Sequence, residues 1–157
     1  MPKVREEGAL GRRTIEGLDA ELIEEAREAL AEVEEFAAEG VPILVEGKKD
    51  RETLERLGIR GTILELSTGD RTLNFLEGLE CERVLILTDF DTRGRELASF
   101  CYEHLIKLGV EPILEPYQKL SKLGKKFKEV ESLVKLRTLL ERIEWRDQKT
   151  TSWRGVR

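Results

Sequence analysis

The chain has 157 residues, of which 39% are hydrophobic and 38% are charged, and its formal net charge is −5. This length fits one domain, and its longest apolar run falls well short of the roughly 18 residues of a transmembrane helix, so we expect no membrane partner. One histidine and two cysteines exclude a four-ligand Cys/His zinc site and a disulfide framework. A reducing compartment, the cytoplasm, is therefore expected.

The charge is distributed unevenly along the chain. Residues 1–115 hold 15 Lys and Arg against 27 Asp and Glu, whereas residues 116–157 hold 12 against 5. A basic segment on an acidic body indicates an anionic partner that contacts the tail, and a solvated helix face is the alternative explanation. Abundant Glu, Lys and Arg with only three Asn and Gln residues are typical of a heat-adapted protein.

The N-terminal segment, residues 1–40, is expected to hold an arm and a helix. Residues 1–17 show no clear period and predict a loose arm. Asp19 is a good N-cap for a helix over residues 20–39, in which apolar residues recur at helical spacing, and Gly40 ends it.

The central segment, residues 41–116, alternates apolar strands with helices. The predicted strands are 42–45, 62–66, 83–88 and 110–114, and the predicted helices are 49–57, 71–79 and 94–108. This alternation predicts an α/β fold with a four-stranded parallel sheet covered by helices on both faces. Pro112 indicates that the last strand lies at an edge of the sheet.

The C-terminal segment, residues 117–157, is basic and helical in pattern. Residues 118–145 predict one or two cationic helices, and the last twelve residues are expected to be mobile. A leucine-rich stripe is expected to pack back on the body, so that the extension belongs to the same compact unit. The stripe consists of Leu133, Leu136, Leu139, Leu140 and Ile143.

Three acidic residues follow strands directly. Glu46 comes after the first strand, and Asp89 and Asp91 come after the third. In the strand order 2-1-3-4 these side chains would meet at the carboxyl edge of the sheet, where ligands of such folds bind. Converging carboxylates repel one another, and a hard cation relieves this, so the pattern predicts one or two Mg²⁺ ions, with Mn²⁺ as a substitute. The alternative is that each acid is only a loop residue or a helix cap.

The turns beside these acids suit phosphate. Lys48 and Lys49 open one predicted helix, and Arg93 and Arg95 flank the start of another. Backbone N–H groups at helix starts favour phosphate binding, and glycines let the backbone turn tightly or approach a ligand closely. The glycines in question are Gly47, Gly69 and Gly94.

Two motifs together resemble a known family. Residues 45–50 read Val-Glu-Gly-Lys-Lys-Asp, and residues 87–94 read Leu-Thr-Asp-Phe-Asp-Thr-Arg-Gly, about 40 residues further on. This pair is similar to the two signatures of the Toprim domain, a strand ending in Glu-Gly and a later strand ending in Asp-x-Asp-x-x-Gly. The resemblance covers about residues 41–116. It is nearest to ribosomal-RNA-maturing Toprim ribonucleases and to small stand-alone Toprim proteins of archaea.

The resemblance implies Mg²⁺-dependent chemistry on nucleic-acid phosphodiesters. Glu46 would then be the acid–base group or a metal ligand, with Asp89 and Asp91 on metal. The chain departs from the large Toprim families, because it is too short for the gating domains of a topoisomerase or the added domains of a primase. The resulting hypothesis is a small nuclease of RNA processing or DNA repair, with RNA or DNA as its partner.

Two other functions compete with the nuclease. One is a nucleic-acid-binding accessory module that keeps the site but leaves catalysis to protein partners. The other is a phosphatase of the haloacid dehalogenase type, because Asp89-Phe90-Asp91 after an apolar strand also suits that motif. Such phosphatases have Thr or Val where this chain has Arg93, and the motif leaves Glu46 unexplained.

Overall fold

The computed structural model describes residues 14–15, 17–66 and 71–154, with side chains over 17–66 and 71–148. A short antiparallel hairpin, β1 (Thr14–Ile15) and β2 (Leu18–Asp19), leads into α2 (Ala20–Ala38). The Asp19 carboxylate accepts a hydrogen bond from the backbone N–H of Glu21, so the predicted N-cap is confirmed. The hairpin occupies part of the expected arm; residues 1–13 and 16 of that arm lie outside the described residues.

The predicted four-stranded parallel sheet is confirmed. Its strands are β3 (Ile43–Val45), β4 (Ile63–Glu65), β5 (Arg83–Ile86) and β6 (Glu111–Ile113), and they lie side by side in the order β4-β3-β5-β6. The central strands β3 and β5 are almost entirely buried, because helices cover both faces of a parallel sheet. The edge position expected from Pro112 is also confirmed, since β6 is the last strand in that order and pairs with β5.

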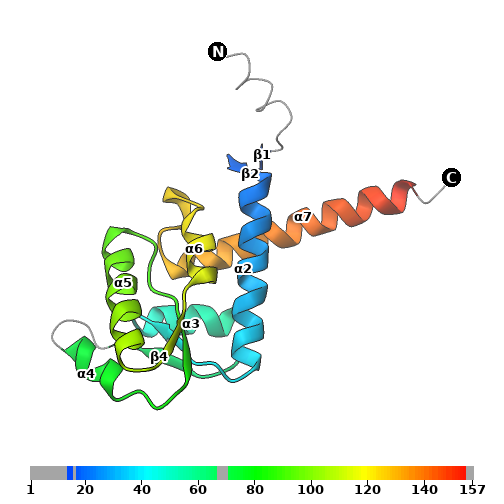
Figure 1. Cartoon of the computed structure of the whole chain (residues 1–157). Helices are drawn as coiled ribbons and strands as arrows, with labels where there is room; N and C mark the ends of the chain where they lie inside the picture. Colours follow the sequence, from blue (N-terminus) through cyan, green and yellow to red (C-terminus); the bar gives the residue numbers. More distant parts are fainter. Residues whose placement is uncertain (1–13, 16, 67–70, 155–157) are drawn as a thin grey trace.

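Helices connect the strands in turn. They are α3 (Lys48–Arg56), α4 (Thr72–Glu77) and α5 (Thr92–Lys107). In Figure 1, α4 and α5 lie together on one side of the sheet and α2 lies on the other. The chain reverses its direction across the sheet after β4, so right-handed crossovers put α3 on the face opposite α4 and α5. The starts of α3 and α5 therefore meet at the carboxyl ends of β3 and β5.

The C-terminal segment packs on the body before it leaves it. It comprises α6 (Glu115–Ser121), two 3₁₀ turns (Lys125–Phe127 and Val130–Ser132) and α7 (Leu133–Arg154). Most of the predicted leucine stripe is buried and contributes to the hydrophobic core. The expected end of helical structure near residue 145 is wrong, because α7 continues to Arg154 and its far half extends away from the other elements (Figure 1).

Candidate metal and phosphate site

The carboxyl edge of the sheet joins the first two predicted acids. Glu46 follows β3 and Asp89 follows β5, and these two strands are neighbours. One carboxylate oxygen of Glu46, Oε2, accepts a hydrogen bond of 2.7 Å from the backbone N–H of Asp89. The convergence of Glu46 and Asp89 predicted from the sequence is therefore present in the structure.

The C-terminal segment holds Asp89 from the other side. Asp89 Oδ1 accepts a hydrogen bond of 3.0 Å from the backbone N–H of Val130, and the Asp89 carbonyl accepts one of 2.6 Å from the Tyr117 hydroxyl. The ring of Tyr117 stacks on Phe90 with centroids 5.1 Å apart, and the N–H of Phe90 donates to the Lys128 carbonyl. Local sequence patterns do not predict these contacts, because they join residues far apart in the chain.

Asp91 has a structural duty of its own. Its Oδ1 accepts a hydrogen bond of 2.7 Å from the backbone N–H of Gly94, which makes Asp91 the N-cap of α5. The alternative of a helix cap thus holds for this residue. Asp91 stands at the exposed rim of the site.

Asp50 is a fourth acid of this site. It is only 7% exposed, and its Oδ2 accepts a hydrogen bond of 3.1 Å from the backbone N–H of Gly47. Burial, together with the neighbouring Asp89 and Glu131 carboxylates, raises the pKa of Asp50 to about 6. Its position three residues after Gly47, in the first turn of α3, is the local signal by which its capping role could have been found.

The acids act on one another electrostatically. Burial and the nearby carboxylates of Glu46 and Asp91 raise the pKa of Asp89 to about 6, although the hydrogen bond from Val130 opposes this. Mutual repulsion of this kind is what a bound cation relieves. Carboxylate oxygens are also the ligands that Mg²⁺ and Mn²⁺ prefer. The chemistry of the donor set therefore fits a hard divalent cation.

The acids do not form a preorganised metal-binding site. Within residues 14–66 and 71–154, residue 16 aside, the structure has no group of three or more His, Cys, Asp or Glu side chains arranged to hold a metal ion. One carboxylate oxygen of each predicted ligand accepts a hydrogen bond from a backbone N–H, and the second oxygen takes no part in these bonds. The three ligands are Glu46, Asp89 and Asp91. Ion binding would have to draw these second oxygens together.

The raised pKa of Asp89 makes the stability of the metal-free protein depend on pH. Because the pKa of Asp89 is about 6 in the folded state, against 3.8 for an aspartate in an unfolded chain, the folded state binds the proton more tightly. The resulting stabilisation is complete below about pH 4 and is lost as the pH rises through 6. Asp89→Asn removes the titrating group and keeps an acceptor for the Val130 N–H. We expect its free energy of unfolding, relative to that of wild type, to increase by about 1 kcal/mol as the pH rises from 5 to 7.5, after allowance for solvent screening.

Urea unfolding in chelator at pH 5, 6 and 7.5 measures this difference. A constant difference between Asp89→Asn and wild type across this range would contradict the raised pKa of Asp89. Groups distant from Asp89 contribute equally to both proteins and cancel in the comparison. The pKa of Asp50, which the Asp89 carboxylate raises, falls in the variant and adds to its gain as the pH rises.

Two substitutions of Asp91 distinguish its role as a helix cap from its proposed role as a metal ligand. Asp91→Ala is expected to lower the free energy of unfolding by about 1 kcal/mol, because it removes the N-cap of α5. Relief of repulsion alone would instead preserve or raise the stability. Asp91→Asn keeps the cap and should unfold like wild type, yet both variants should bind Mn²⁺ more weakly in calorimetry. Wild-type Mn²⁺ affinity in both variants would remove Asp91 from the ligand set.

The predicted phosphate-binding cations flank these acids. Lys48 and Lys49 lie in the first turn of α3, and Arg93 and Arg95 lie in the first turn of α5, all with exposed side chains. The guanidinium of Arg95 also donates to the Ser121 carbonyl at 3.3 Å. All four cations therefore stand at helix starts beside the carboxyl edge of the sheet.

The three glycines predicted at the site differ in what the fold demands of them. A Cβ on Gly94 would lie 2.0 Å from the carbonyl oxygen of Asp89, whereas a Cβ on Gly47 would meet no atom within 4 Å. Gly94 is thus required by the close approach of α5 to its own chain, and Gly47 has free space that a ligand could use. Gly69 lies outside the described residues.

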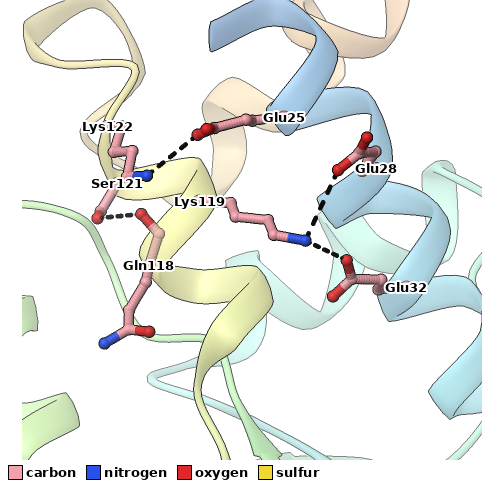
Figure 2. Close-up of polar contacts among 7 residues, drawn as sticks. All are labelled: Glu25, Glu28, Glu32, Gln118, Lys119, Ser121 and Lys122. Carbon is pink, nitrogen blue, oxygen red and sulfur yellow. Dashed lines mark hydrogen bonds and ion pairs between the residues drawn. The ribbon is translucent and has the colours of Figure 1, made fainter. Parts of the chain in front are cut away.

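Part of the basic tail is held by acids of α2. Lys119 contacts Glu28 and Glu32, and Lys122 contacts Glu25 at 3.2 Å (Figure 2). On α7, Arg137 pairs with Glu34 in the same way. These cations of the basic tail therefore have partners within the protein, and an external anion is not needed to explain them.

A four-stranded parallel sheet covered by helices, with a carboxylate cluster at its carboxyl edge, defines an α/β fold. The chain belongs to the UPF0292 family. It is 42% identical over 115 residues to a UPF0292 protein of Methanosarcina acetivorans, covering 71% of this chain and 78% of that protein. A UPF0292 protein of Methanosarcina barkeri is 40% identical over 114 residues, covering 71% and 79%.

A solved structure also resembles this chain. It is a protein from Aquifex aeolicus with a TM-score of 0.55 and 27% identity, covering 67% of this chain and 94% of that one. No family model matches the chain. None of the helices in the described ranges is both long enough and apolar enough to cross a bilayer.

Proposed function

We propose that the chain is a Toprim-type protein that acts with Mg²⁺ on nucleic-acid phosphodiesters, as a small nuclease. The observation that carries this proposal is the hydrogen bond from the Asp89 backbone to Glu46, which joins the two sequence motifs across adjacent strands. The strand order β4-β3-β5-β6 supports it, because it places β3 beside β5. Both cysteines of the chain are free thiols, which suits the cytoplasm as the place of the reaction.

The roles of the residues follow from their positions. Glu46, Asp89 and Asp91 would hold one or two ions, and a bound Mg²⁺ would neutralise charge on the phosphoryl group and acidify a water molecule. The Glu46 carboxylate, which accepts a hydrogen bond from the Asp89 N–H, would accept a proton from the attacking group. Lys48, Lys49, Arg93 and Arg95 would orient the phosphate backbone without reading sequence.

Space for a substrate lies beside the acids. A cavity of about 320 Å³ runs between α3 and the start of α7, and Lys49, Arg56 and Glu131 line it. Glu131 also acts electrostatically on Asp50, so this cavity borders the acidic cluster. Its wall holds two cations, Lys49 and Arg56, and two acids, Glu52 and Glu131, so it offers room for a strand that passes the site but no net positive charge.

The second candidate is an accessory module that binds nucleic acid without cutting it. The observation in its favour is the lack, among the described residues, of three acids already grouped around a metal position. Such a module would keep the cations at the helix starts and leave catalysis to a partner.

Purified protein incubated with labelled RNA and DNA in Mg²⁺, Mn²⁺ or chelator tests the proposal. We expect metal-dependent cleavage of at least one nucleic acid, and none in chelator. Binding of nucleic acid without cleavage in either metal would favour the accessory module. Hydrolysis of a phosphomonoester in place of nucleic acid would favour the dehalogenase-type phosphatase.

A further inference from the structure

One face of α7 carries cations and an aromatic ring but no acid. Its residues are spaced by three, four, three and one positions, so they lie along one side of the helix. The acids of this part of α7 lie outside this sector, and Glu141, four positions before Trp145, borders it; the other two are Glu144 and Asp147. The acid-free face consists of Lys135, Thr138, Arg142, Trp145 and Arg146, and Lys149 continues the spacing in the sequence.

The near end of this acid-free face opens into a groove. The groove has a volume of about 430 Å³ between the 3₁₀ turn at Lys125–Phe127 and α7. Phe127, Val134 and Leu139 contribute its apolar lining, and Lys126, Lys135 and Arg142 contribute its positive charge. A ligand with apolar surface and negative charge would be complementary to this lining.

The far end of the face presents an exposed indole. Trp145 is 58% exposed, on the half of α7 that extends away from the other elements (Figure 1). Arg142 and Arg146, both exposed, lie next to it on the same face. Elsewhere in the basic tail, Lys119 and Lys122 pair with acids of α2 (Figure 2), and Arg137 pairs with Glu34. The acid-free face is distinguished by its exposed indole between two exposed guanidinium groups.

We propose that the acid-free face of α7 binds a single-stranded segment of nucleic acid, with a base stacked on Trp145 and phosphates on Arg142 and Arg146. This inference rests on the proposed function and names the form of its substrate. The charge of the face complements a phosphate backbone, and an exposed ring beside cations is the usual platform for unpaired bases. In a duplex the bases are already stacked, so they do not present their faces to the indole.

The geometry suits a short stretch of strand. Lys135 and Arg146 are eleven residues apart on the helix, which corresponds to about 16 Å along its axis. The groove at one end and the indole at the other then contact different nucleotides of one strand. The acidic cluster is not part of this surface, so binding does not require a metal.

Fluorescence anisotropy in chelator tests the inference, with fluorescein-labelled 12-nucleotide single-stranded RNA, single-stranded DNA and the matching duplexes as probes. Trp145→Ala should weaken single-strand binding at least about fivefold and change duplex binding less than twofold. Gln148→Ala, an exposed neighbour on the same helix, is the matched control and should bind like wild type. Circular dichroism verifies that each variant is folded.

The charged half of the inference has its own readout. The double variant Arg142→Gln with Arg146→Gln should lower the salt dependence of binding by about 1.4 in the log–log slope, since each single-strand phosphate contact contributes about 0.7. Arg60→Gln with Lys107→Gln removes the same charge from exposed positions outside α7 and should leave the slope unchanged.

Equal effects of the two double variants would overturn the inference, as would wild-type affinity in Trp145→Ala. Competition by polyglutamate as effective as that by RNA would also overturn it, in favour of an acidic protein partner. Since no cleavage occurs in chelator, these outcomes are independent of the nuclease proposal. Selective single-strand binding by a protein that never cuts would support the inference and refute the nuclease.

Discussion

Glu46→Gln is expected to lower metal-dependent cleavage of nucleic acid at least about a hundredfold, within the range of 10²–10⁴ typical of general acid–base catalysis. The substitution keeps the size of the side chain and an amide oxygen that can accept the hydrogen bond from Asp89 N–H. The fold should therefore persist while the charge and the basicity are lost. Single-turnover rates with saturating protein measure the effect on chemistry alone.

Binding should respond differently from cleavage. Glu46→Gln is expected to change nucleic-acid affinity in chelator less than twofold, because the proposed phosphate contacts belong to cations at the helix starts and on α7. Glu55→Gln makes the same chemical change at an exposed position of α3 and should cut like wild type. Wild-type cleavage by Glu46→Gln would refute the role of Glu46.

A large deletion cannot replace this comparison. Removal of residues 118–157 would take away Leu120, Leu133 and Leu136, which are fully buried, together with the Val130 N–H that holds Asp89. Such a truncation is expected to unfold the body. Point substitutions on the exposed part of α7 test the contribution of the tail to binding without this loss.

The strands could be predicted because their signals are local. Ile43 to Val45 and Val84 to Leu87 are unbroken apolar runs, and such runs between helices indicate a parallel sheet buried on both faces. Pro112 predicted an edge strand for an equally local reason, since proline has no backbone N–H to donate to a neighbouring strand. The sheet edge that gathers Glu46 and Asp89 follows from the same pattern.

The docking of the C-terminal segment could not be predicted, because it depends on contacts between distant residues. Val130 lies 41 positions from Asp89, and nothing in either local sequence marks the hydrogen bond between them. The charge asymmetry was visible in the sequence, yet it did not reveal that Glu25, Glu28 and Glu32 of α2 face the tail cations (Figure 2). The sequence shows an excess of cations in the tail, and only the fold shows which acids pair with them.

Burial of single polar residues was equally hidden. Asp50 lies in a run of charged residues and is expected to be solvated, but the first turn of α3 turns it inward onto the Gly47 N–H. Its raised pKa depends on Asp89 and Glu131, which approach it only in the folded chain. The extent of the acidic cluster is therefore a property of the packing.

Gly94→Ala is expected to cost at least about 3 kcal/mol of unfolding free energy, the upper end of what overpacking usually costs. The added Cβ would lie 2.0 Å from the carbonyl oxygen of Asp89 and 2.5 Å from its carbonyl carbon, and these backbone atoms cannot rotate away. Two further contacts depend on this approach. The Thr88 hydroxyl donates to the Gly94 carbonyl at 2.7 Å, and the Gly94 N–H donates to Asp91.

Gly47→Ala is the matched control, because its Cβ would meet no atom within 4 Å and its φ of −155° suits any residue. It should lose less than about 1 kcal/mol. Urea unfolding of both variants measures the contrast, and equal stabilities would contradict the close approach at Gly94. The same contrast explains the glycine of the second motif physically. Gly94 lets the first turn of α5 press against Asp89, so that Asp89 and Asp91 are held at the sheet edge by their own backbone before any ligand arrives.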